Sequence, residues 1–157
     1  MVPSFFFIQK FFILSIDFSS AIADYSVSED AGASSVTDLD DVFTDIDLTN
    51  GADEYLQTLS YSVTANDNSA LCTTSIDSDG NLSVSFTEDD NGTCGITVTA
   101  DDSSGSTLDD SFTVTVNPVN DSVSGTNIAD YTVDEDAATT SVADLDDVFD
   151  DIDLTNG

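Results

Sequence analysis

Apolar and polar residues alternate along much of the chain with a period of two. The first clear run has Leu59, Tyr61, Val63 and Ala65 at alternate positions, with polar residues between them. Three later runs follow the same pattern: Leu82, Val84 and Phe86; Ile96, Val98 and Ala100; Phe112, Val114 and Val116. Because successive side chains of a strand point to opposite faces of a sheet, each run predicts a strand with one buried face.

Turn-forming residues separate these runs. They stand at residues 67–68, 79–81, 90–92 and 103–105, and are rich in Asp, Asn, Ser and Gly. Shorter apolar runs at 25–27, 34–39 and 71–76 bring the expected number of strands to about seven. Helical periodicity is sustained nowhere, and the segment around Val42 and Phe43 predicts a single turn at most. The sequence therefore predicts an all-β protein, a Greek key β-sandwich of about seven strands.

A long internal repeat sets the domain organisation. Residues 22–51 and 128–157 are identical at 23 of 30 positions and begin 106 residues apart. A unit of that length matches a single immunoglobulin-sized sandwich, in a tandem array whose neighbours contact one another. We therefore expect a complete repeat at 24–127 and the truncated start of a second repeat at 128–157, which cannot bury its apolar face alone.

The first 23 residues differ in composition from the rest. They are rich in Phe and Ile, carry Lys10, and end in Ala21-Ile22-Ala23, the small-x-small arrangement at which signal peptidases cleave. The apolar run is too interrupted for a membrane span. We expect residues 1–23 to be a signal peptide or a disordered N-terminal segment outside the fold, which implies a secreted or cell-surface protein; a misassigned start codon is the alternative.

The charge balance excludes several function classes. The formal net charge is −31, from 32 acidic residues against one basic residue. Such a surface repels phosphate backbones and anionic lipid, so neither nucleic acid nor direct membrane binding is expected. The chain has no His, no Arg and no Trp, which removes the Ser-His-Asp triad, His-ligated zinc and an aromatic sugar cleft. We therefore expect no enzymatic activity.

The two cysteines occupy inward positions of predicted strands. Cys72 shares a strand face with Ile76, and Cys94 shares one with Ile96 and Val98. In an exported protein the simplest arrangement is a Cys72–Cys94 disulfide; two buried free thiols are the alternative. Their spacing does not fit a CxxC redox or metal motif.

Four segments over residues 24–127 form a further pattern: VSEDAG, FTDID, ITVTADDSSG and FTVTVNPVND. In these segments the chain resembles the cadherin-like repeat of bacterial surface adhesins, including its dystroglycan-type variety, and the resemblance implies an immunoglobulin/cadherin-like Greek key β-sandwich. In that family calcium lies between successive repeats, and calcium takes six to eight oxygen ligands. The resemblance implies ligands at the lower end of the repeat from three parts of the chain: Glu29, Asn120 and Asp121; Asp151 and Asp153 of the next copy; and Glu88 and Asp89.

At the upper end, the resemblance assigns Asp45, Asp47 and Asp101 to a half-site that a preceding repeat would complete. The implied function is a calcium-binding repeat of an extracellular adhesin or stalk, with adjacent repeats of the same chain as partners. A cell-surface protein or a carbohydrate remains open as an outside partner. The alternatives are a calcium-independent acidic spacer, stabilised by any salt at equal ionic strength, and an accessory module of a secreted hydrolase.

Overall fold

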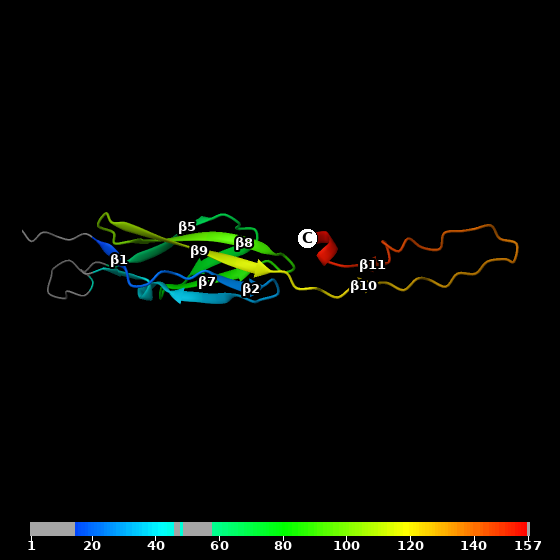
Figure 1. Ribbon diagram of the computed structural model, residues 1–157, viewed down its shortest axis with the longest axis horizontal. Helices are drawn as coiled ribbons and strands as arrows, with labels where there is room; N and C mark the ends of the chain where they lie inside the picture. Colours follow the sequence, from blue (N-terminus) through cyan, green and yellow to red (C-terminus); the bar gives the residue numbers. More distant parts are fainter. Residues whose placement is uncertain (1–14, 46–47, 49–57, 157) are drawn as a thin grey trace, which may run out of the picture.

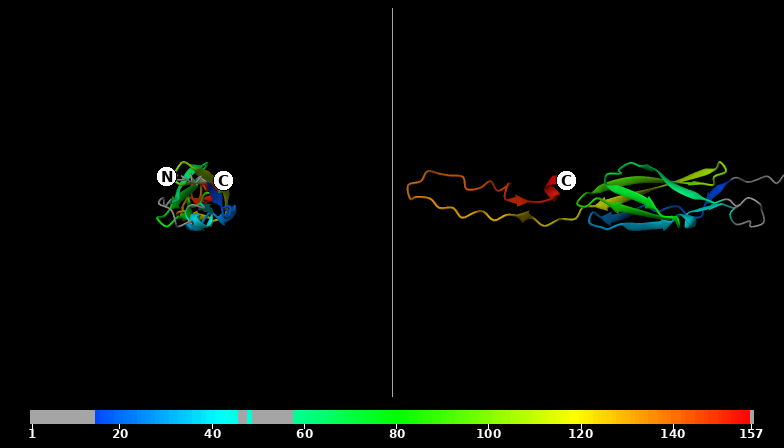
Figure 2. Two further views of the ribbon diagram at one scale, coloured as in Figure 1. Left: turned by 90° about the vertical axis from the view of Figure 1, so that its left-hand side faces the viewer. Right: turned by 180° about the vertical axis from the view of Figure 1, so that it is seen from behind.

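The computed structural model describes residues 15–45, 48 and 58–156. A sandwich occupies one end of an elongated molecule, and the chain beyond it runs outward as a thin segment and returns toward the sandwich (Figures 1 and 2). The strands of the sandwich are β1 (Ile16–Phe18), β2 (Tyr25–Ser28), β3 (Ser34–Asp38), β4 (Phe43–Asp45), β5 (Ser60–Asn66), β6 (Cys72–Ile76), β7 (Asn81–Phe86), β8 (Gly92–Asp101) and β9 (Thr107–Asn117). The 3-10 helix η1 (Leu39–Asp41) lies between β3 and β4.

Seven of these strands form the two main sheets of the sandwich and confirm the predicted all-β fold, and β1 and β4 form a small separate sheet. One sheet has the order β2-β9-β8-β5 and the other has the order β3-β7-β6. Strand β2 runs parallel to β9, and the other pairs in these two sheets are antiparallel. These seven strands coincide with the seven expected from the alternation of apolar residues.

The inward positions of both sheets form one core. Its most deeply buried members include Leu82, Val84, Ile96, Val98 and Val114, which the period-two pattern places on inner faces. The pattern is wrong at Ala65, which is exposed. A bulge between Val63 and Ala65 reverses the parity of β5, so that Asn66 turns inward and its amide donates to the carbonyl of Cys72 at 2.8 Å.

The predicted disulfide is confirmed. Cys72 on β6 and Cys94 on β8 are bonded, with their Cα atoms 6.4 Å apart, and both residues are fully buried. Because β6 and β8 belong to different sheets, the bond joins the two layers through the core. A disulfide of this kind is compatible with an oxidising, extracellular location.

Part of the N-terminal segment packs on the sandwich, which differs from the expectation that residues 1–23 lie outside the fold. Strand β1 pairs antiparallel with β4, and Ile16 and Ile22 are both buried in the core. The Ile22 N–H donates to Asp110 Oδ2 at 2.6 Å. Residues 1–14, which hold most of the proposed signal peptide, lie outside the described residues.

The second copy contains little regular structure. Strands β10 (Ser124–Gly125) and β11 (Phe149–Asp150) pair with each other, and the short helix α2 (Asp153–Asn156) follows. Strand β11 is the counterpart of β4 in the repeat, and its pairing with β10 is one residue out of the β1–β4 register. Within the described part of the chain, no helix is long and apolar enough to cross a bilayer.

Candidate metal centre

Three carboxylates from distant parts of the sequence meet where the sandwich joins the second copy. Glu29 follows β2, Asp121 follows β9, and Asp153 begins α2. One carboxylate oxygen from each lies within 4.8 Å of the others. Three anionic oxygens at this separation can approach a single divalent cation, and oxygen is the ligand that calcium prefers.

Backbone hydrogen bonds hold Glu29 in place. Its N–H donates to the carbonyl of Asn117 at 3.0 Å, which continues the parallel pairing of β2 with β9. Its Oε1 accepts from the N–H of Val119 at 2.6 Å. The residue is 2% exposed, so its charge is buried at the end of the sandwich. Burial of a carboxylate is unfavourable unless hydrogen bonds or a cation offset it.

Asp121 and Asp153 are tied to each other. The Asp121 N–H donates to Asp153 Oδ2 at 2.9 Å, and the Asp153 N–H donates to Asp151 Oδ1 at 3.1 Å. Asp151 therefore orients Asp153 and does not itself join the cluster of three. The linker and the second copy meet through these carboxylates.

The surroundings of Asp121 disfavour its ionised form. Desolvation raises the pKa of Asp121, and the negative charges of Asp30, Asp89, Asp153 and Glu29 raise it further. Asp121 Oδ2 is buried and accepts no hydrogen bond. A bound cation would stabilise these ionised groups together, because an opposite charge favours the charged form of each carboxyl.

The other residues expected at the lower end have different positions. Asp89, in the turn before β8 with a positive φ of 57°, is near enough for its charge to act on Asp121. Asn120 is exposed, and its amide donates to the carbonyl of Asp121 at 2.7 Å. Glu88 is exposed and lies outside the cluster of three. Asp30, which the sequence analysis missed, directly follows Glu29 and also acts on Asp121.

The residues expected at the upper end do not form a comparable trio within the described chain. Asp45 ends β4 and is fully buried. Asp101 is partly exposed, and its Oδ1 accepts from the Ser103 N–H at 2.6 Å. Asp47 lies outside the described residues.

Asp102 is a buried carboxylate that the sequence analysis missed. It is 1% exposed, and its Oδ1 accepts from the N–H groups of Ser104, Gly105 and Ser106 at 2.7, 3.0 and 3.0 Å. Burial opposes its ionisation, but these hydrogen bonds outweigh burial and lower its pKa. The signal was present in the sequence, since the inward parity of Cys94, Ile96, Val98 and Ala100 continues to residue 102, whereas Asp101 has the outward parity.

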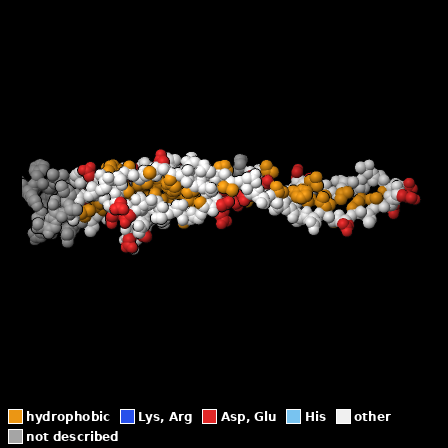
Figure 3. All heavy atoms as spheres, turned by 60° about the horizontal axis from the view of Figure 1, so that its bottom comes forward, with side chains coloured by type: hydrophobic (Ala, Val, Ile, Leu, Met, Phe, Trp, Pro, Cys, Tyr) orange, Lys and Arg blue, Asp and Glu red, His pale blue; other side chains and the backbone are white. Residues whose placement is uncertain are grey.

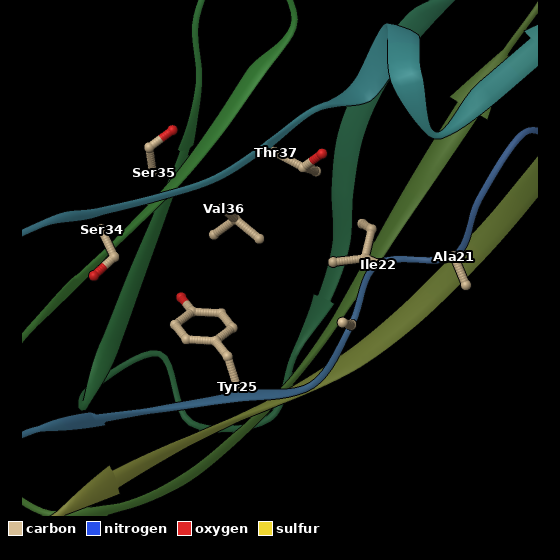
Figure 4. A pocket seen from close by; sticks show the side chains of 8 residues that line it. Ala21, Ile22, Tyr25, Ser34, Ser35, Val36 and Thr37 are labelled. Atoms are coloured by element: carbon tan, nitrogen blue, oxygen red, sulfur yellow. The ribbon is translucent and has the colours of Figure 1, made fainter.

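A separate cavity of about 510 Å³ opens between the edge strands β2 and β3. Figure 4 shows the Tyr25 side chain between these strands. The Tyr25 hydroxyl is buried without a hydrogen-bond partner, and burial raises its pKa. Small and apolar residues form the lining: Ala21, Ile22, Ala23, Ser34, Ser35, Val36 and Thr37. With no carboxylate in the lining, this cavity offers neither an acid–base pair nor a metal ligand set.

Comparisons with known proteins add little. No protein-family model matches the chain, and no curated protein matches it. Among solved structures, 11 chains match. One is an endo-fucoidan hydrolase from glycoside hydrolase family 107, which is 16% identical with a TM-score of 0.44. The match covers 66% of this chain and 14% of that chain, and a similarity this low has no bearing on function.

Proposed function

We propose that the chain is a non-catalytic, extracellular calcium-binding repeat of the cadherin-like kind that serves as a stalk or adhesin module. The observation that supports this proposal is the approach of Glu29, Asp121 and Asp153 to within 4.8 Å. These residues come from the end of one repeat, the linker and the next copy. A cation held among them would connect all three.

The charges of the cluster favour a bound calcium ion over a cluster that holds no cation. Glu29 is buried, and the ionised form of Asp121 is disfavoured by its neighbours. A hard divalent cation with flexible oxygen coordination offsets both costs. Carbonyl groups of the linker and water would supply the remaining ligands that calcium requires.

The mechanical consequence is a stiffened junction. Without a cation, the carboxylates repel one another and the linker is free to bend. With a cation, the linker and the second copy are fixed to the end of the sandwich. A series of such junctions would form a rod that holds a distal module away from the cell surface.

Calcium titration of the chain, followed by calorimetry and thermal unfolding at constant ionic strength, tests the proposal. Calcium should raise the unfolding midpoint by more than sodium or magnesium does, because only a ligand of the native state stabilises it. Glu29→Gln, Asp121→Asn and Asp153→Asn should each weaken binding at least tenfold. Asp79→Asn, an exposed turn residue, serves as the matched control.

The effect of Asp121→Asn on the unfolding midpoint distinguishes a cation site from an ordinary acidic surface. Because the pKa of Asp121 is raised, its ionised form destabilises the cation-free fold at neutral pH. Asp121→Asn should therefore raise the midpoint without calcium and lower it with calcium. If calcium changed the unfolding midpoint equally in all variants and in the Asp79→Asn control, this cluster would not be a calcium site. The chain would then be a spacer stabilised by salt of any kind.

A further inference from the structure

Asn91 is an exposed asparagine that is directly followed by a glycine. It lies between the turn after β7 and Gly92, the first residue of β8. Its side chain makes no hydrogen bond with any described residue. The amide of Asn91 is therefore open to water and is not held in place by the fold.

Gly92 has a backbone that other residues rarely adopt. Its φ is 141°, and a Cβ built on it would lie 3.4 Å from the Leu71 side chain, so a larger residue would be strained there. Without a Cβ, Gly92 does not shield its own backbone nitrogen from the Asn91 side chain. As the first residue of β8, Gly92 also lies at a strand end, where pairing with β9 opens most readily.

The chemistry of this pair needs only water. Asparagine is a thermolabile residue, because its side-chain amide carbon is one five-membered ring away from the next backbone nitrogen. When the Gly92 nitrogen attacks Asn91 Cγ, a new N–C bond closes a succinimide, and the side-chain NH₂ leaves as ammonia with the proton from the Gly92 nitrogen. Water then opens the ring at either carbonyl and leaves aspartate or isoaspartate. One water is consumed and one ammonia is released.

We propose that Asn91 is a site of spontaneous deamidation, at which the chain acquires one more negative charge close to the junction between the sandwich and the second copy. The reaction requires neither an enzyme nor calcium. It converts a neutral residue of the segment before β8 into a carboxylate.

The new carboxylate would join an acidic neighbourhood. Figure 3 shows acidic side chains where the sandwich meets the outlying segment that follows β9. Asp89 and Asp90 directly precede Asn91, and the charge of Asp89 already acts on Asp121. The one basic residue of the chain is Lys10, so little opposite charge offsets the repulsion. The deamidated chain should therefore be less stable at low ionic strength.

Two other asparagines serve as internal controls. The Asn81 amide donates to both carboxylate oxygens of Asp77, at 3.2 and 3.0 Å, which holds it away from its own backbone. Asn127 is exposed like Asn91, but it is followed by Ile128, whose branched side chain crowds the backbone nitrogen. We expect both residues to keep their amides while Asn91 loses its own.

Incubation of the folded full chain at pH 8 and 37 °C, followed by chymotryptic peptide mapping, tests the proposal. The peptide that contains Asn91 should gain about one dalton, in an aspartate and an isoaspartate form. The gain should be at least tenfold faster than at Asn81 and Asn127, which fragmentation in the mass spectrometer locates. Equal rates at the three positions would overturn the proposal.

Urea and a matched variant separate the site from its surroundings. Asn91→Gln keeps a neutral amide but closes a larger ring far more slowly, so the same peptide should gain no mass in this variant. The folded chain should deamidate at Asn91 at a rate comparable with that in urea. A site that reacts in urea and is stable in the folded chain would show that the fold protects Asn91, and the proposal would be wrong.

Thermal unfolding measures the effect of the added charge. Asn91→Asp carries the charge of the product without a change of the backbone, and Asn91→Gln is its neutral partner. Without divalent cations at low ionic strength, the midpoint of Asn91→Asp should be the lower of the two, and the difference should shrink as sodium chloride is added. Equal midpoints at low ionic strength would contradict the proposed repulsion near the junction.

Discussion

At the scale of single residues, the parity of a strand decides which of two adjacent acids is buried. Asp101 and Asp102 are neighbours in sequence, yet Asp102 faces the interior and Asp101 faces outward. The alternation through Cys94 and Ala100 would have identified Asp102 before the structure was known. The resemblance to a family gave Asp101 instead, because an acidic motif alone does not show which carboxylate points inward.

Asp102 gives a pH-dependent prediction. Its pKa is lowered in the folded state, so its ionised form adds stability above its ordinary pKa of 3.8, and this contribution is lost as the pH falls through the lower, folded value. Asp102→Ala should destabilise the chain at pH 7 by about 1–3 kcal/mol, since three backbone N–H groups lose their acceptor. The difference from the unmodified chain should shrink below pH 4.

Chemical denaturation of both chains between pH 3 and pH 8 measures this difference. Asp79→Asn is again the control, because Asp79 is exposed. A destabilisation of Asp102→Ala that stays constant across this range would mean that packing, not the charge of the carboxylate, accounts for it.

At the scale of elements, the strands of the sandwich follow from the sequence, and the exceptions have local causes. Apolar alternation placed the seven strands of the two main sheets, and inward parity placed Cys72 and Cys94 for their disulfide. Ala65 differs because a bulge shifts the register by one residue, which no composition signal in β5 indicates. Strand β1 differs because its residues have the composition of a leader segment, and only the pairing with β4 shows that they pack on the fold.

Ile22 tests whether this N-terminal strand region contributes to stability. The side chain is 7% exposed in the core, so Ile22→Ala should cost about 2–4 kcal/mol through lost burial and the cavity left behind. Val119→Ala, at an exposed linker position, should cost under about 1 kcal/mol, as is usual away from the core. The free energy of unfolding in urea compares the two variants.

The predicted signal-peptide cleavage site bears on the same region. Cleavage after Ala23 would remove both β1 and Ile22, and the remaining chain should then be less stable by at least the Ile22→Ala difference. The intact mass of the protein purified from its natural source gives the position of its N-terminus. Unfolding of a chain that begins at Asp24 gives the change in stability. Equal stability of the two chains would show that β1 and Ile22 contribute nothing to the folded repeat.

At the scale of the whole molecule, three carboxylates connect the sandwich to the second copy. The sequence could name Glu29, Asp121 and Asp153 through the repeat and the family resemblance, but their approach depends on how the linker turns after β9. The effects of Asp30 and Asp89 on the pKa of Asp121 were harder to predict from the sequence, because they depend on how the segments after β2 and before β8 are placed. We therefore expect charge at this junction to control how freely the outlying segment moves.

Calcium should narrow the range of distances between the sandwich and the outlying segment. The chain has no free cysteine among its described residues, so spin labels attach selectively at Ser62→Cys, on an exposed position of β5, and at Thr139→Cys, on an exposed position of the second copy. Pulsed electron paramagnetic resonance should give a broad distribution of label-to-label distances without calcium, because the clustered carboxylates repel one another, and a narrow distribution with calcium.

With Asp153→Asn the distance distribution should stay broad at every calcium concentration, whereas Asp79→Asn should behave like the unmodified chain. Calcium binding without narrowing would separate the cation site from any mechanical role, and the junction would then be a flexible tether that also binds calcium.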